Sequence, residues 1–187
     1  MSRIFEGKAA LITGSGHGIG RATALRMASL GATVGVNDIK PEFVEKVVAE
    51  IEQAGGKAGA AAQNVSTRDG MRSAVFGFAG TQGRLDIMVN NAAWVRYQAV
   101  PDIAPDTMER MLDIGFKAVV WGIQAAAEAM DAERGGAIVN VASIAGLTSA
   151  KNSVVYSGIK AGVMGITRAG AAELGARRIR VNAVAPS

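Results

Sequence analysis

The fold is decided by the stretch Thr13-Gly14-Ser15-Gly16-His17-Gly18-Ile19-Gly20, which directly continues an apolar run that begins at Ala9. Its glycines permit a tight turn and bring backbone N–H groups close to a diphosphate. A helix that begins inside the stretch points its positive N-terminal end at the same group. The pattern is T-G-x-x-x-G-x-G and departs from G-x-G-x-x-G. Strand, glycine turn and helix in this order predict a dinucleotide-binding fold, whereas glycines alone would also fit a flexible loop.

Short apolar runs alternate with helical segments along the rest of the chain, as in a parallel sheet covered by helices. The expected strands are Ala9–Thr13, Thr33–Asn37, Ala58–Gln63, Leu85–Asn90, Ala137–Val141 and Arg180–Ala183. The expected helices are Gly18–Leu30, Pro41–Ala54, Thr67–Phe78, Asp106–Met130 and Val155–Leu174. We therefore predict an α/β doubly wound parallel sheet with helices on both faces, a three-layer αβα Rossmann fold, with residues 1–187 as a single domain.

The composition excludes several functional classes. The net charge is +4, but the basic residues are scattered and lack an aromatic platform, which argues against nucleic acid as a partner. The chain has no cysteine and one histidine, so a disulfide framework, a cysteine nucleophile and a metal site are not expected. The N-terminal residues lack the apolar core of a signal peptide, and no apolar run reaches membrane-spanning length, so we expect a cytoplasmic protein with no membrane segment.

Polar residues follow the second and fourth expected strands, at the edge where open α/β sheets bind ligands. Asp38 can accept hydrogen bonds from the adenosine ribose, and its charge repels a 2′-phosphate, so NAD is favoured over NADP although Lys40 lies close by. Capping of the turn before Pro41 is the alternative interpretation of Asp38. Asn90-Asn91-Ala92-Ala93 lets the backbone approach the adenosine side of the cofactor, unless it is merely a turn.

Three further residues indicate proton and hydride chemistry. Ser143 follows the fifth strand, and Tyr156 and Lys160 stand four residues apart on the fifth helix, where they share one face. A phenol keeps its proton near neutral pH, and a neighbouring ammonium stabilises the phenolate, so the pair can act as acid and base. The Ser143 hydroxyl can stabilise a developing alkoxide. A tyrosine and lysine at this spacing are ordinarily a surface pair, and the prediction rests on their conjunction with the glycine turn.

Together these motifs resemble the short-chain dehydrogenase/reductase family from about Phe5 to Ser187. The matching segments are Thr13 to Gly20, Asp38, Asn90-Asn91-Ala92, Ser143, Tyr156 to Lys160 and Arg180 to Pro186. The resemblance implies that Lys160 also bonds the nicotinamide ribose and that Pro186 flanks the nicotinamide. It also implies a dimer or homotetramer built on helices 106–130 and 155–174. The expected cofactor-binding residues are Gly14, Ser15, His17, Gly18, Ile19, Asp38, Ile39, Asn64, Val65, Asn91, Ala92, Ala93, Tyr156, Lys160 and Pro186.

Three residues depart from the family's pattern. Asn64 stands where the family usually has Asp beside the adenine, and Ala93 replaces a glycine. Gly115 stands where the family usually has an Asn that helps hold a water near the active-site lysine. We expect Gly115 to permit a helix distortion that exposes a carbonyl to that water. Family members also continue well past a proline that matches Pro186. We therefore expect the protein to carry a further segment that completes the substrate pocket, and the alternative is a truncated protein with half an active site.

The predicted function is an NAD(H)-dependent oxidoreductase that interconverts a secondary alcohol and a ketone, with Ser143, Tyr156 and Lys160 as catalytic residues. Two alternatives remain: an NADPH-dependent 3-oxoacyl thioester reductase, and a catalytically silent nucleotide-binding or assembly module. The partner is then a small-molecule alcohol or ketone whose identity the sequence does not disclose. The residues expected near it are Trp94, Arg96, Ala145, Leu147, Lys151 and Asn152.

Overall fold

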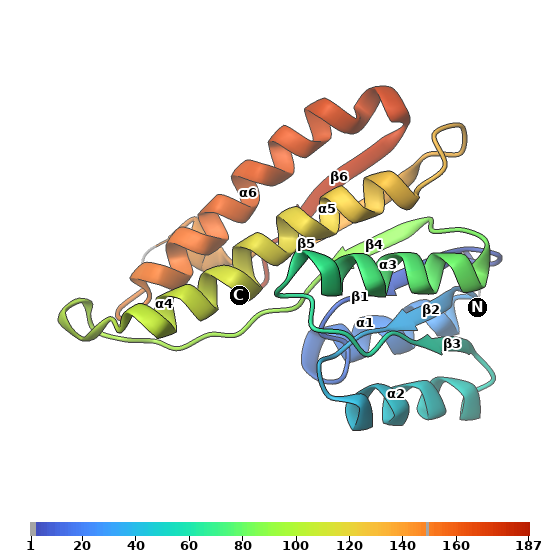
Figure 1. The fold of residues 1–187 in the computed structure, drawn as a ribbon, viewed down its shortest axis with the longest axis horizontal. Helices are drawn as coiled ribbons and strands as arrows, with labels where there is room; N and C mark the ends of the chain where they lie inside the picture. The colour runs from blue at the N-terminus through green and yellow to red at the C-terminus, as the bar shows by residue number, and fades with distance from the viewer. Residues whose placement is uncertain (1–2, 149) are drawn as a thin grey trace.

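The computed structural model describes residues 3–148 and 150–187 and contains a six-stranded parallel sheet (Figure 1). Its strands are β1 (Ala9–Ile12), β2 (Thr33–Val36), β3 (Lys57–Ala60), β4 (Ile87–Asn90), β5 (Gly136–Val141) and β6 (Ile179–Val184). They lie in the order β3-β2-β1-β4-β5-β6, and every neighbouring pair is parallel. The order reverses between β1 and β4, and such a switch point is where open α/β sheets bind ligands. The predicted Rossmann fold is confirmed.

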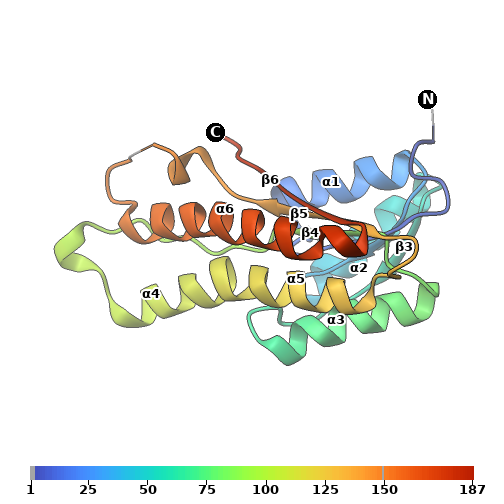
Figure 2. The same cartoon turned by 90° about the horizontal axis from the view of Figure 1, so that it is seen from above.

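Helices cover both faces of the sheet (Figure 2). They are α1 (Gly18–Ser29), α2 (Pro41–Gln53), α3 (Arg68–Gln82), α4 (Pro105–Leu112), α5 (Ala118–Ala129) and α6 (Val154–Leu174). The short turns are η1 (Val100–Asp102), η2 (Asp113–Lys117), η3 (Ile144–Gly146) and η4 (Gly175–Arg177). Within the described ranges, no helix is both long enough and apolar enough to cross a bilayer.

The central strand β1 shows why the sheet needs both layers. Its side chains alternate between the two faces because successive residues of a strand point in opposite directions. Ala9 and Leu11 pack into the core beneath α3 and α5, whereas Ala10 and Ile12 pack into the core beneath α1 and α2. All four residues are buried, which explains why the run is continuously apolar and carries no polar face.

The long helix predicted over Asp106–Met130 is interrupted. It begins at Pro105, and η2 is a π-helical turn that separates α4 from α5. Gly115 lies buried inside this turn, and a Cβ on it would lie 3.1 Å from Cγ2 of Ile159 on α6. The absence of a side chain therefore lets the widened turn pack closely against α6. The expected distortion at Gly115 is present.

The third strand is shorter than the predicted Ala58–Gln63. Beyond its end, hydrogen bonds from a side chain take the place of the backbone hydrogen bonds between strands. The strand ends at Ala60, and the Asn37 side-chain amide donates to the carbonyls of Ala61 at 2.7 Å and Gln63 at 3.1 Å.

The third helix is longer than predicted and continues to Gln82. Gly83, with a φ of 67°, ends it in the left-handed conformation typical of a helix C-terminus.

Asp86 anchors the start of the sheet and gives the fold a defined acid sensitivity. Its carboxylate accepts hydrogen bonds from the Ala9 N–H at 2.8 Å and from Arg84 Nε at 2.7 Å, and Lys8 lies 3.7 Å away. Burial by itself raises the pKa of this carboxyl. The Arg84 and Ala9 hydrogen bonds and the charges of Arg84 and Lys8 outweigh burial, so the pKa lies below its usual value.

We expect Asp86→Asn to reduce the loss of stability in acid. Because the folded pKa is lowered, the carboxylate's contribution is complete above about pH 4 and is lost as the pH falls through the lowered pKa. Urea unfolding at neutral and acid pH measures the change in the free energy of unfolding. That change is expected to be smaller in Asp86→Asn than in the wild type and unaltered in the exposed control Asp102→Asn. Equal acid sensitivity in all three proteins would contradict the assignment.

Candidate functional site

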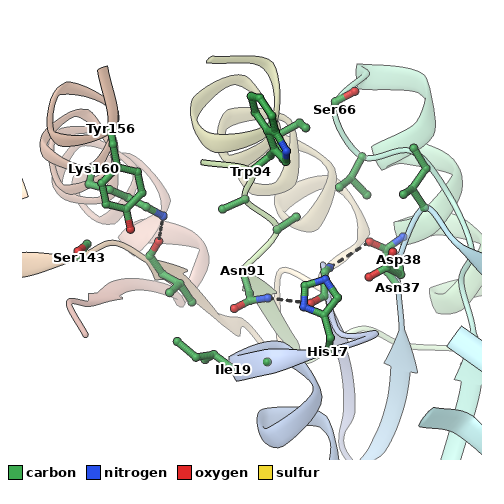
Figure 3. A pocket seen from close by; sticks show the side chains of 18 of the residues that line it. His17, Ile19, Asn37, Asp38, Ser66, Asn91, Trp94, Ser143, Tyr156 and Lys160 are labelled. Atoms are coloured by element: carbon green, nitrogen blue, oxygen red, sulfur yellow. Dashed lines mark hydrogen bonds between the residues drawn. The ribbon is translucent and has the colours of Figure 1, made fainter. Parts of the chain in front are cut away.

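A cavity of about 830 Å³ opens at the carboxyl ends of β1, β2, β4 and β5 (Figure 3). It includes residues of the glycine turn, the segments after these strands, α4, η2 and α6. Every residue expected to bind the cofactor or to act in catalysis lines the cavity, with the exception of Ser15. Ser15 is fully buried, and its hydroxyl donates to the Ile12 carbonyl at 2.8 Å, so it secures the turn from behind.

Side-chain amides that directly follow β2 and β4 hold the glycine turn in place. The side-chain oxygen of Asn37 accepts from the Gly14 N–H at 3.4 Å, and the backbone carbonyl of Asn37 accepts from the Ser15 N–H at 2.7 Å. On the other side, the Asn91 amide donates to the carbonyls of Thr13 at 2.9 Å and Gly14 at 3.0 Å. The segment Asn90-Asn91-Ala92-Ala93 was predicted to approach the adenosine side of the cofactor, and in the structure the Asn91 amide supports the turn. The turn is therefore fixed by the protein itself.

Close contacts explain why Gly14 and Gly20 carry no side chain. Gly14 has a φ of 61°, and a Cβ on it would lie 2.8 Å from the Cα of Ala92. A Cβ on Gly20 would collide with the Gly14 carbonyl and would lie 2.5 Å from Nδ2 of Asn91. Larger residues at either position would push the turn away from the β4 segment that supports it.

Asp38 lies at one end of the cavity, against the glycine turn. Its side chain is buried, and Oδ1 accepts from the Lys40 N–H at 3.2 Å. Oδ2 lies so close to Gly16 that a Cβ there would be 2.7 Å away. The Lys40 ammonium lies over the Phe43 ring, 5.0 Å from its centre. The carboxylate is thus held by a backbone N–H, while its second oxygen lies beside the turn.

Tyr156, Lys160 and Ser143 meet at the other end of the cavity (Figure 3). The Lys160 ammonium lies 5.7 Å from the centre of the Tyr156 ring and donates to the Val141 carbonyl at 2.7 Å. Burial lowers the pKa of Lys160 to about 8. The Ser143 hydroxyl oxygen accepts from the Ala145 N–H at 3.2 Å, which leaves its own hydrogen to be donated to a ligand. A proton donor, a buried cation and a hydroxyl donor therefore share one wall.

Two aromatic side chains that follow β4 complete the cavity. The rings of Tyr97 and Tyr156 meet edge to face, with centres 5.8 Å apart. Trp94 carries the guanidinium of Arg110 on its face, 4.2 Å from the ring centre. Trp94 and Ala145 line the cavity as expected. The other residues expected near the substrate are not part of its described lining: Arg96, Leu147, Lys151 and Asn152.

Sequence reasoning missed several lining residues, namely Asn37, Phe43, Gln63, Tyr97, Arg110, Ile114 and Ile144. Asn37 was detectable because it is the polar residue next to Asp38 at a strand end. Arg110 and Ile114 lie four residues apart, but their facing toward the cavity depends on how α4 docks. That docking is a tertiary contact for which the sequence carries no local signal.

The chain is similar to known proteins over nearly its whole length. The family model for short chain dehydrogenases matches residues 8–187. Cyclohexanol dehydrogenase from Acinetobacter sp. (strain SE19) is 41% identical over 187 residues, which are 100% of this chain and 74% of that enzyme. A 3-oxoacyl-[acyl-carrier-protein] reductase from Thermotoga maritima is 39% identical over 181 residues, which are 97% of this chain and 74% of that enzyme.

Solved structures of dehydrogenases share the fold of this chain. A 7α-hydroxysteroid dehydrogenase in complex with NADH and 7-oxo glycochenodeoxycholic acid superimposes with a TM-score of 0.94 and 31% sequence identity. The match covers 100% of this chain and 72% of that one. Both the sequence and the fold therefore point to the same group of proteins.

Proposed function

The chain belongs to the short-chain dehydrogenase family of oxidoreductases, and from this premise we propose that it interconverts a secondary alcohol and a ketone with NAD(H). The observation that carries the proposal is the meeting of Tyr156, Lys160 and Ser143 in one cavity whose far end contains Asp38. The experiment is to measure NADH oxidation with simple ketones, beginning with cyclohexanone. Absence of turnover on ketones, oxoacyl thioesters and oxosteroids alike would favour the catalytically silent binding module.

The lining has the chemistry that a dinucleotide needs. Within the described chain, the His17 side chain makes no capping hydrogen bond and the first turn of α1 carries no acid. The backbone N–H groups of that turn therefore suit a diphosphate near Gly18 and Ile19. Asp38 and Ile39 would hold the adenosine ribose, and Asn64, Val65, Ala92 and Ala93 would surround the adenine side. Pro186 would flank the nicotinamide, which supplies hydride acceptance and donation when bound.

The remaining steps belong to the chain's own side chains. The Tyr156 hydroxyl gives a proton to the carbonyl oxygen in reduction and removes it in oxidation. Lys160 stabilises the phenolate through its positive charge, and it would also donate to the nicotinamide ribose. The Ser143 hydroxyl donates to the same substrate oxygen and stabilises negative charge as it develops. The cavity walls hold the reacting groups together.

We expect Asp38→Ser to relax the choice of cofactor. The wild type should use NADH better than NADPH, because the carboxylate accepts from the ribose hydroxyls and repels a 2′-phosphate. Loss of one such charged interaction is expected to lower the ratio of kcat/KM for NADH to that for NADPH by about tenfold or more. Glu42→Gln, an exposed acid of α2 outside the cavity lining, is the control. A wild type that prefers NADPH would overturn the role of Asp38.

A 3-oxoacyl thioester reductase is the second candidate, because the Thermotoga maritima relative has that activity in its name. The two candidates differ in both reactants. Under the first, cyclohexanone with NADH is the better pair, and under the second, an acetoacetyl thioester with NADPH is. Rates for the four combinations separate them.

The proposal also includes a cytoplasmic, homo-oligomeric protein that assembles through α4, α5 and α6. Apolar side chains are distributed around these helices, and Met108 is 41% exposed while Phe116 and Trp121 are half-buried. A partner subunit would cover such surface. Light scattering of the purified protein measures the assembled mass.

A further inference from the structure

Arg110 presents a fixed guanidinium to the cavity. It belongs to the last turn of α4, and its guanidinium carbon stands 4.2 Å from the centre of the Trp94 ring. A planar guanidinium stacks on an indole face and keeps its N–H edges available for hydrogen bonds. Both side chains line the cavity. The stacking therefore orients an exposed cation whose N–H donors are bonded by no other residue of the described chain.

No carboxylate within residues 3–148 and 150–187 pairs with Arg110. Three acids lie near it along the helix, and each is engaged elsewhere. Glu109 and Asp113 both pair with Lys117, at 3.7 and 2.8 Å, and Asp106 accepts from the Thr107 N–H at 2.8 Å. The guanidinium thus remains a charge that an anionic ligand can neutralise.

The two lysines of the described lining already have partners within the protein. The Lys160 ammonium donates to the Val141 carbonyl, and the Lys40 ammonium lies over Phe43 beside Asp38. Figure 3 shows Trp94 across the cavity from His17 and Ile19, between the Tyr156–Lys160 pair and Asp38. Arg110, stacked on Trp94, therefore belongs to the wall that faces the glycine turn.

We propose that Arg110, oriented by Trp94, binds an anionic group in the middle of the catalytic cavity, opposite the glycine turn. Two sources share this chemistry: the diphosphate of the cofactor and a carboxylate carried by the substrate. The inference rests on the proposed function for the identity of these reactants. A guanidinium in this position forms two parallel hydrogen bonds to either anion, and an ammonium forms weaker and less directed ones.

The test compares Arg110→Gln and Arg110→Lys with Arg96→Gln. Arg96 is an equally exposed arginine of the same β4 segment as Trp94, but it is not in the described lining of the cavity, so it controls for general charge. Titration of nicotinamide fluorescence gives the Kd for NADH without turnover. Steady-state kinetics then give kcat/KM for cyclohexanone and for 4-oxocyclohexanecarboxylate, a neutral and an anionic form of the same ketone.

Each source predicts a separate result. If the diphosphate is bound, Arg110→Gln raises the Kd for NADH by about tenfold. If a substrate carboxylate is bound, the Kd is unchanged, and the preference for the carboxylated ketone over the neutral one falls by about tenfold. In either case Arg110→Lys shows a smaller effect and Arg96→Gln none.

Two results would overturn the inference. The first is an Arg110→Gln protein with unaltered NADH affinity and unaltered substrate preference. The second is an equal loss for both ketones at constant NADH affinity, which indicates a structural role for the Trp94 stack. Failure of the wild type to reduce any ketone would contradict the proposed function. The NADH titration would then decide the diphosphate source, and equilibrium binding of 4-oxocyclohexanecarboxylate and of cyclohexanone to the wild type and Arg110→Gln would decide the carboxylate source.

Discussion

Tyr156→Phe is expected to lower kcat by about 100- to 10,000-fold, the usual contribution of a positioned general acid or base. The substitution removes the hydroxyl and keeps the ring, which packs edge to face against Tyr97 with the centres 5.8 Å apart. The wall of the cavity therefore stays in place while the proton donor is lost. Steady-state kinetics measure the loss, and fluorescence titration should return nearly the wild-type affinity for NADH.

The two readouts separate chemistry from folding. Loss of turnover together with loss of NADH binding would point to a disturbed cavity, and circular dichroism would then detect the change. Turnover within about threefold of the wild type would remove Tyr156 from the mechanism, because a positioned general acid typically contributes about 100-fold or more.

Gly122→Ala is expected to be strongly destabilising because α5 packs directly on a buried amide. A Cβ at Gly122 would overlap the side-chain oxygen of Asn90 and would lie 2.7 Å from its Cγ. The Asn90 side chain has no room to turn, since it donates to Asn140 at 2.8 Å and Asn140 donates to Thr167 at 2.9 Å. Overpacking of this kind costs about 1–3 kcal/mol of unfolding free energy, and breakage of the amide chain adds to it.

Urea unfolding measures the loss, and Gly77→Ala provides a control of opposite sign. Gly77 is an exposed helical position of α3, and a Cβ there would meet nothing within 4 Å. Helix propensity predicts that this substitution raises stability by about 0.5–1 kcal/mol. In an Asn90→Ala background, Gly122→Ala should cost less, because the overlapping atoms are gone. Equal cost in both backgrounds would show that another contact is responsible.

Most of the framework was predictable because it depends on local patterns. Each of the six strands was expected within a few residues, since buried parallel strands are continuous apolar runs such as Ala9 to Ile12. Tyr156 and Lys160 were predicted together because one helical turn brings such a pair onto one face. The Asp38 position followed from its distance along the chain from the glycine turn.

The remainder depended on contacts between distant segments. Ser15 was expected to line the cofactor site, but its hydroxyl turns inward to the Ile12 and Asn37 carbonyls. Arg96 was expected near the substrate, whereas the arginine of the lining is Arg110. Side-chain direction in an irregular segment such as residues 91–99 is set by packing, for example by the bond from the Gln98 N–H to Asn152. The periodicity of apolar residues in the sequence does not predict such contacts.

The π-helical turn at Asp113–Lys117 also sets the rotation of α4 about its axis, and this rotation determines which α4 side chains face the cavity. A π-turn is equivalent to one residue inserted into an α-helix, and one residue corresponds to a rotation of about 100° about the axis. Deletion of Gly115 would regularise the helix and turn α4 by that angle relative to α5. Arg110 and Ile114 would then face away from the cavity, while α5 kept its place on the sheet. At this point the chain's length, and not its residue types alone, determines which side chains meet the ligand.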